Sequence, residues 1–215
     1  MDPGTGEIIA LTSHPNYDPN LFPRGIAPKD WVRLSNDPSH PLYNRAIQSV
    51  YPPGSTFKVI VSLAGLDSGL RTPEDRVLSS GLTNHDDKAT CTGSIKSAKK
   101  SFNKKKKEGH GTLTFHRGLV ESCDVYFYTM GDRIGFDRVA QYARNMGLGS
   151  ISGIPIADEK AGLIPTVAWK KEKVGEPWYP ADNYINSIGQ GFVLVSPIQA
   201  CQMIGAIANG GLFYK

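Results

Sequence analysis

Residues 52–58 read Pro52-Pro53-Gly54-Ser55-Thr56-Phe57-Lys58, a serine at the start of an apolar segment with a lysine three positions later. The Pro-Pro-Gly run cannot extend a helix backwards, so it predicts a helix that begins at about Ser55. The residues that follow, as far as Leu66, are almost all apolar, and Asp67-Ser68-Gly69 after them is typical of a helix C-terminus. The pattern therefore predicts a buried helix with Ser55 at its N-terminus.

The spacing of Ser55 and Lys58 suits nucleophilic chemistry. Residues at i and i+3 share a helix face, so the Lys58 ammonium is expected to reach the Ser55 hydroxyl. A lysine that is partly desolvated can lose its proton and act as a base for the serine, and a helix start offers unpaired N–H groups to an oxyanion. The alternative is an N-capping serine on a core helix with a lysine that extends to solvent, because S-x-x-K is a short and common motif.

A second polar group, Glu121-Ser122-Cys123-Asp124, lies between two segments predicted as helices, 113–120 and 125–134. Here a hydroxyl and a carboxylate stand side by side and can relay a proton, although Ser122 or Asp124 can also simply cap the following helix. S-x-x-K followed by an S-D-N-like triplet is typical of serine β-lactamases and penicillin-binding proteins. Their third motif, Lys-Thr-Gly, does not occur in these 215 residues.

The chain resembles the transpeptidase domain of class B penicillin-binding proteins, in particular the elongation-type penicillin-binding protein 2. The resemblance runs from end to end, and many short segments follow one another in the family's order. The segments are Asp2-Pro3-Gly4-Thr5-Gly6, the stretch 51–58, Gly109-His110-Gly111, Ser122-Cys123-Asp124, Glu159-Lys160-Ala161-Gly162, Trp169-Lys170-Lys171, Ile188-Gly189-Gln190-Gly191 and Asn209-Gly210-Gly211. So many ordered matches are far more specific than S-x-x-K alone.

The resemblance implies an α/β fold, the α+β sandwich of β-lactamases and transpeptidases, in which a largely antiparallel sheet is flanked by helices. We expect residues 1–215 to be a partial penicillin-binding transpeptidase domain, truncated at both ends. Turn residues at 2–6 precede a strand predicted over 7–13, and another strand is expected to begin at 212–214. The family's first strand, Lys-Thr-Gly strand, membrane anchor and pedestal domain would then lie outside these residues, and this piece alone would be inactive.

The function that the resemblance implies is that of a serine-type peptidoglycan D,D-transpeptidase, which binds penicillin and cross-links stem peptides at D-Ala-D-Ala during cell-wall elongation. In that reading Ser55 attacks the carbonyl of the penultimate D-Ala and Lys58 takes the serine proton. Ser122 passes a proton to the departing amine, and Asp124 holds the polar network. A β-lactamase or β-lactam sensor, a D,D-carboxypeptidase and a non-catalytic interaction module remain as alternatives.

The same resemblance adds substrate-binding roles for Gln190 and Gly191. The partners it implies are peptidoglycan stem peptides, β-lactams as covalent inhibitors and the cell-wall elongation machinery, with no cofactor. It implies a protein of the inner membrane whose catalytic domain is periplasmic. No stretch of about 18 uninterrupted apolar residues occurs in this sequence to provide the anchor.

Some relatives bind zinc in this region, and Cys91, His110 and Asp86 (or Asp87) are the candidate ligands here. Where the family often has a further cysteine after the position of Phe102, this chain has a run of lysines, which removes a soft ligand and adds repulsive charge. We therefore predict no metal.

The formal net charge is +4, and seven lysines between positions 96 and 107 account for it. Two interpretations of that run stay open: a solvated loop, or contact with an anionic polymer or lipid. Nucleic acid is not indicated, because no aromatic residues or known binding motif accompany the lysines.

Near the C-terminal end, Ser196-Pro197-Ile198-Gln199 predicts a capping box and a helix with Cys201 and Ile204 on its core side. Cys123 is expected to pack inwards.

Overall fold

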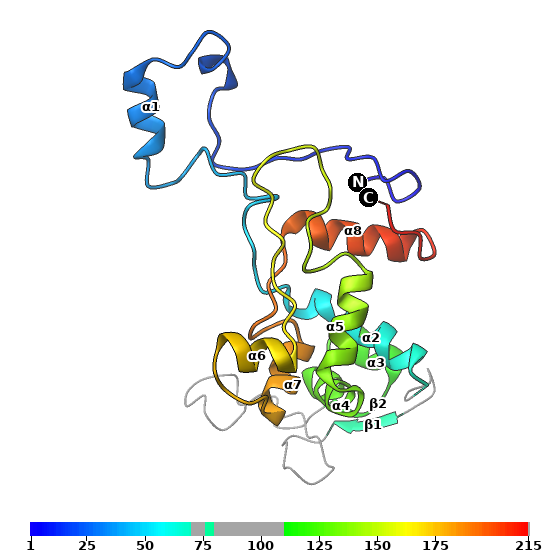
Figure 1. The fold of residues 1–215 in the computed structure, drawn as a ribbon. Helices are drawn as coiled ribbons and strands as arrows, with labels where there is room; N and C mark the ends of the chain where they lie inside the picture. Colours follow the sequence, from blue (N-terminus) through cyan, green and yellow to red (C-terminus); the bar gives the residue numbers. More distant parts are fainter. Residues whose placement is uncertain (70–75, 80–109, 215) are drawn as a thin grey trace. The chain divides into compact units, whose positions relative to one another are not determined.

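The computed structural model describes residues 1–69, 76–79 and 110–214 (Figure 1). These residues form two compact units, each assembled from segments that lie far apart in the sequence. Unit 1 consists of Met1–Tyr51, Met146–Gly162 and Val195–Lys215, and unit 2 consists of Pro52–Asn145 and Leu163–Leu194. Both catalytic motifs predicted from the sequence therefore belong to unit 2.

Unit 1 contains the helical elements η1 (Pro19–Leu21), α1 (Pro28–Ser35) and α8 (Pro197–Ala208). Helix α8 begins as the sequence predicts, because Ser196 and Gln199 form a reciprocal capping box. Ser196 Oγ accepts a hydrogen bond from Gln199 N at 3.4 Å, and Gln199 Oε1 accepts one from Ser196 N at 3.0 Å. Pro197 occupies the first helical position, where a missing N–H leaves no hydrogen bond unmade.

The buried face of α8 differs from the predicted one. Cys201 is exposed and Ile204 is 45% exposed, so the prediction that both face the core is wrong. Gln199 is fully buried instead, and its Nε2 donates to Ser150 O at 2.6 Å and to Ala161 O at 2.7 Å. Because these carbonyls satisfy the amide, a polar side chain can occupy a core position and turn the apolar neighbours towards solvent.

Two strand predictions in unit 1 are also wrong. The turn at residues 2–6 forms, closed by a hydrogen bond from Gly6 N to Asp2 O at 2.9 Å. Neither 7–13 nor 212–214 is a strand in the part of the chain that the structure describes. An extended segment becomes a strand only when a neighbouring strand pairs with its N–H and C=O groups, and the alternation of side chains does not reveal whether such a neighbour is present.

Unit 2 is mostly helical. Its elements are η2 (Gly54–Phe57), α2 (Lys58–Asp67), β1 (Arg76–Ser79), β2 (Gly111–Thr114), α3 (Phe115–Val120), α4 (Asp124–Ile134), α5 (Phe136–Asn145), α6 (Val167–Lys173) and α7 (Pro180–Ser187). Strands β1 and β2 pair antiparallel, with Arg76 opposite Thr114. Residues 113 and 114, predicted as helix, therefore belong to a strand. Of the large sheet expected from the resemblance, the described residues contain this two-stranded piece.

Helix α2 packs against α4 and α5 inside unit 2, and α4 packs against α7 (Figure 1). Ile60, Val61 and Ala64 of α2 are fully buried, as the apolar run predicts. The helix ends at Asp67, and Gly69 follows with φ of 68°, which confirms the predicted C-terminus. No helix among the described residues is long and apolar enough to cross a membrane.

Candidate active site

Ser55 is exposed and lies at the start of a helical segment, as predicted, although the first turn of that segment is a 3-10 helix and not an α-helix. It is the second residue of the 3-10 turn η2, and α2 begins three residues later at Lys58. Gly54, directly before the serine, has φ of 58°, a conformation that strains any residue with a side chain. Its N–H donates to the carbonyl of Gly189 at 2.9 Å. The turn therefore presents the Ser55 hydroxyl to solvent while the residues that follow enter the core.

Lys58 is buried, with 1% of its side chain exposed, and its ammonium is fully hydrogen-bonded. Nζ donates to Ser122 O at 2.8 Å, to Ser122 Oγ at 2.9 Å and to Asp124 Oδ1 at 2.5 Å. The ring of Phe127 lies 5.5 Å from Nζ and adds a cation–π contact. An ammonium carries three N–H groups, so these three acceptors account for all of them. The Asp124 carboxylate compensates a charge that would otherwise be costly to bury.

Ser122 joins the two motifs. Its Oγ donates to Ser55 Oγ at 2.9 Å, in addition to accepting from Lys58. Ser122 has φ of 48°, a region that non-glycine residues rarely adopt, and strained residues of this kind gather at functional sites. A continuous set of polar contacts thus runs from Ser55 Oγ through Ser122 Oγ and Lys58 Nζ to Asp124. We call it the catalytic chain, after the roles that the sequence predicts for these residues.

The route between Ser55 and Lys58 is not the direct one predicted from their spacing. Among the described residues, the hydrogen bonds of Ser55 Oγ reach Lys58 only through Ser122. Capping of α4 by Asp124 or Ser122 does not occur, because Cys123 is the N-cap residue and the Asp124 carboxylate turns to Lys58. The alternative interpretation, in which the lysine extends to solvent, is also wrong, because the Lys58 side chain is buried. Cys123 is fully buried, as predicted.

Gln190 and Gly191 lie on the turn that follows α7, next to η2, the turn that carries Ser55. A Cβ built on Gly54 would lie 3.5 Å from Gln190 Nε2, so this exposed amide is adjacent to the residue that precedes Ser55. Gly191 has φ of 69° and supports the turn. The structure thus brings both residues to the same side of unit 2 as Ser55, and a role in binding substrate stays a prediction.

Gly189 is a residue of the site that the motif analysis does not single out. Its φ is +69°, and a Cβ there would collide with the carbonyl of Gly54 and lie 2.7 Å from Phe57 Cβ. The absence of a side chain is what lets the backbone of the 188–191 turn touch the backbone of η2. The two glycines of Gly189-Gln190-Gly191 are the signal in the sequence for such a close approach.

We expect Gly189→Ala to lower the free energy of unfolding by about 1–3 kcal/mol more than Gly175→Ala does. Gly175 has a similar φ of +79° with open space around it, so both variants strain the backbone and only the first adds a collision. Chemical denaturation of both variants measures the difference. Equal losses would show that the contact between the two turns is not close-packed.

The residues weighed as metal ligands in the sequence are only partly described. Cys91 and Asp86 lie outside the described residues, so the structure does not test them, whereas His110 precedes β2. Among the described residues no group of three or more His, Cys, Asp or Glu side chains is arranged to hold a metal ion.

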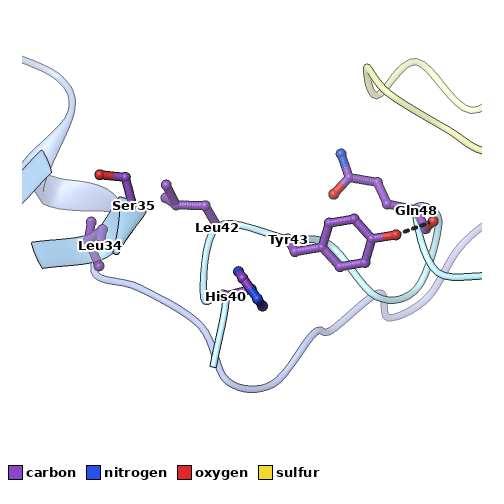
Figure 2. A pocket seen from close by; sticks show the side chains of 6 residues that line it. All are labelled: Leu34, Ser35, His40, Leu42, Tyr43 and Gln48. Carbon is purple, nitrogen blue, oxygen red and sulfur yellow. Dashed lines mark hydrogen bonds between the residues drawn. The ribbon is translucent and has the colours of Figure 1, made fainter. Parts of the chain in front are cut away.

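A pocket of about 270 Å³ in unit 1 contains none of the predicted site residues. Leu34, His40, Tyr43 and their neighbours line it, and the Tyr43 hydroxyl donates to Gln48 O at 2.5 Å (Figure 2). The lining carries no nucleophile paired with a base, so the catalytic chain of unit 2 remains the candidate active site.

The chain belongs to the family defined by the penicillin binding protein transpeptidase domain, whose family model matches residues 1–215. This membership confirms the family inferred from the motifs and gives the chain the transpeptidase fold. The sheet that the resemblance implies is represented among the described residues by β1 and β2.

Three relatives illustrate the similarity. Peptidoglycan D,D-transpeptidase MrdA of Escherichia coli K12 is 38% identical over 211 residues, which are 98% of this chain and 32% of that protein. The Helicobacter pylori PBP2 structure in complex with MreC gives a TM-score of 0.83 at 32% identity, covering 98% of this chain and 37% of that one. Penicillin-binding protein A of Mycobacterium tuberculosis, as a penicillin G acyl-enzyme complex, gives 0.76 at 29% identity, covering 99% and 46%. The chain thus spans about a third of the length of the MrdA protein.

Proposed function

We propose that residues 1–215 carry the nucleophile and the proton-transfer groups of a serine acyltransferase that cross-links peptidoglycan stem peptides during cell-wall elongation. The observation that carries the proposal is the catalytic chain, which connects an exposed serine to a buried lysine through a second hydroxyl. Similarity to a peptidoglycan D,D-transpeptidase supports the choice of substrate. The acyl-enzyme formed by a mycobacterial relative with penicillin G supports covalent chemistry.

The geometry suggests how the protons move. Lys58 carries three hydrogen bonds as an ammonium, so it can act as a base only after one proton has left, and the Asp124 carboxylate that it contacts is the acceptor we propose. Lys58 then accepts the Ser55 proton through Ser122 Oγ. Ser55 Oγ attacks the carbonyl carbon of the penultimate D-Ala, and the bond to the nitrogen of the terminal D-Ala breaks.

The leaving amine takes its proton from Ser122 Oγ, which is reprotonated by Lys58, because the acylated Ser55 Oγ carries no proton. The amine of a second stem peptide then attacks the ester carbonyl, its proton passes to Lys58 and on to Ser55 Oγ, and the cross-link leaves the enzyme. The proton transfers among Ser55, Ser122, Lys58 and Asp124 use contacts within hydrogen-bond distance, which is the requirement for general acid–base catalysis.

Covalent labelling tests the proposal. Incubation with penicillin G should raise the intact mass by that of the whole ligand, because opening the β-lactam ring releases no leaving group. Peptide mapping should then place the adduct on Ser55. Absence of an adduct, or an adduct on another residue, would reject the assignment.

The labelling should use the longest gene product that contains residues 1–215, because these residues include neither Lys-Thr-Gly nor Lys-Ser-Gly. In the family, the strand that carries the Lys-Thr-Gly motif supplies one donor of the oxyanion hole. Losing one such donor costs about 10²–10³ in rate. We therefore expect the 215-residue chain by itself to acylate far more slowly. Product analysis with a pentapeptide substrate, with and without an amine acceptor, separates cross-linking from hydrolysis.

We further propose that the catalytic unit works on the outer side of the cytoplasmic membrane as part of the elongation machinery. The similarity to H. pylori PBP2, whose structure was solved with MreC, supports this placement. Co-purification of the longest gene product with the MreC protein of the same cell, from a membrane extract, tests it.

A further inference from the structure

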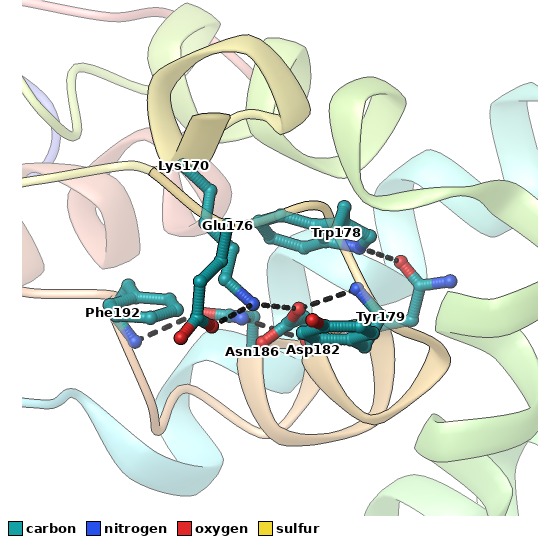
Figure 3. A network of polar contacts seen from close by, with 8 residues as sticks. Lys170, Glu176, Trp178, Tyr179, Asp182, Asn186 and Phe192 are labelled. Carbon is teal, nitrogen blue, oxygen red and sulfur yellow. Dashed lines mark hydrogen bonds and ion pairs between the residues drawn. The ribbon is translucent and has the colours of Figure 1, made fainter. Parts of the chain in front are cut away.

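Lys170 of α6 is a buried cation that the catalytic chain does not use. Its side chain is 3% exposed, and Nζ donates to Asp182 Oδ2 at 2.6 Å, with Glu176 Oε2 at 3.8 Å (Figure 3). The ring centroids of Tyr179 and Phe192 lie 4.5 Å and 5.7 Å from Nζ. A buried ammonium is costly unless it is paired, and these partners offset that cost for Lys170. A lysine that served only to keep the protein soluble would stay exposed, so the burial of Lys170 calls for another explanation.

Asp182 connects Lys170 to the beginning of α7. It is the third residue of that helix, and the same Oδ2 that binds Lys170 accepts a hydrogen bond from Tyr179 N at 2.7 Å. A carboxylate at this position also interacts favourably with the helix N-terminus. Lys170 therefore fastens α6 to the first turn of α7.

The C-terminal end of α7 leads into a turn that contacts η2, the turn that carries Ser55. Asn186 Nδ2 donates to Asp182 O at 2.7 Å, and Asn186 Oδ1 accepts from Phe192 N at 3.0 Å, so one amide spans α7 and the turn after it. That turn contains Gly189, whose carbonyl accepts from Gly54 N at 2.9 Å. A continuous path of hydrogen bonds and helix backbone thus leads from Lys170 to the residue before Ser55.

A second path consists of aromatic side chains. Trp178 Nε1 donates to Asn183 Oδ1 of α7 at 2.8 Å (Figure 3). The Trp178 ring stacks on Phe136 with centroids 5.5 Å apart, and Phe136 stacks on Phe57 at 6.3 Å. Phe57 is two residues from the nucleophile and fully buried. Both paths therefore start within residues 178–182, where Lys170 binds Asp182, and both end at η2.

We propose that Lys170 is a positioning residue for Ser55, acting through α7 and the 188–192 turn. The proposal rests on the proposed function, since it assigns Lys170 to the same acylation reaction. Displacing a reacting group by about 1 Å can cost about 10²-fold in rate. Loss of the Lys170 ion pair should therefore slow the acylation step without removing any group that touches the ligand.

The test is Lys170→Met in the longest gene product, with Lys171→Met as the matched control on the exposed side of the same helix. Saturation kinetics with a fluorescent penicillin separate the dissociation constant of the first complex from the rate constant of acylation. For Lys170→Met we expect the rate constant to fall about 10–100-fold and the dissociation constant to change less than about 3-fold. Lys171→Met should match the parent in both.

Lys170→Met leaves the Asp182 carboxylate without its cation, so the variant can lose stability as well. The double variant Lys170→Met/Asp182→Asn removes that charge and keeps an acceptor for Tyr179 N, and it should recover most of the melting temperature but not the acylation rate. Lys170→Arg, which keeps the cation, should restore the rate to within about 3-fold of the parent.

Hydrogen exchange at the Gly54 amide provides a readout that needs no activity. It should become faster in Lys170→Met than in Lys171→Met, because Gly189 would hold this N–H less firmly. Parent-like acylation in the double variant, or loss of folding in both Lys170→Met variants, would show a purely structural role and overturn the proposal. If the parent itself is not labelled at Ser55, the proposed function fails instead.

Discussion

Replacing Ser55 by alanine is expected to abolish covalent labelling by penicillin. The serine is exposed on η2, and its hydroxyl is the terminal group of the catalytic chain, where it accepts a hydrogen bond from Ser122 Oγ. Removal of an exposed hydroxyl should change the free energy of unfolding by no more than about 0.5 kcal/mol. Intact-mass spectrometry after incubation with penicillin G, together with a thermal melt, measures both effects.

Thr56→Ala is the matched control for this variant. Thr56 is exposed on the same turn, and its hydroxyl donates to Pro53 O at 2.8 Å and makes no contact with the catalytic chain among the described residues. The control should keep its label on Ser55. A label that persists in Ser55→Ala would mean that another residue is the nucleophile.

Replacing Lys58 by arginine is expected to reduce the rate constant of acylation by about 10²–10⁴, the usual contribution of a general base. A guanidinium keeps the positive charge beside Asp124 but does not give up a proton in a protein. Arginine can therefore preserve the ion pair and remove the base. Acylation kinetics with a fluorescent penicillin measure the loss.

Lys171→Arg, on the exposed side of α6, controls for the substitution itself and should acylate like the parent. A thermal melt of Lys58→Arg shows whether the larger side chain fits a site that is 1% exposed. Near-parent acylation by a folded Lys58→Arg protein would make Lys58 an electrostatic anchor, and the base would have to be sought elsewhere.

The polar residues of the candidate site can be found from the sequence because each belongs to a short motif with a chemical rationale. Ser55 and Lys58 are three positions apart, and Ser122 and Asp124 are two apart, so each pair is recognisable as a local motif even though Ser55 and Lys58 are connected through Ser122. The buried helix α2 and the capping box at Ser196 follow from local patterns in the same way.

Features that depend on contacts across the chain could not be predicted. Ser122 stands between Ser55 and Lys58 because two segments meet in space, and no local pattern reports that meeting. Lys170 and Lys171 are neighbours of identical type, yet one is buried and the other exposed, since only the arrangement of α6 beside α7 separates them. The missing strands at 7–13 and 212–214 have the same cause, because pairing is not a local property.

The hydrogen bonds between Lys58 and the second motif connect residues 64 and 66 positions apart. Bringing such distant residues together costs chain entropy before the contact returns any energy, so the site forms only after the intervening loop has closed. That cost grows slowly, by about 0.6 kcal/mol for each doubling of loop length. Insertions between the two motifs, outside α2, β1, β2 and α3, should therefore be tolerated far better than a one-residue insertion within either motif. The length of the connecting segment is then open to evolutionary change while Ser55 and Ser122 continue to meet.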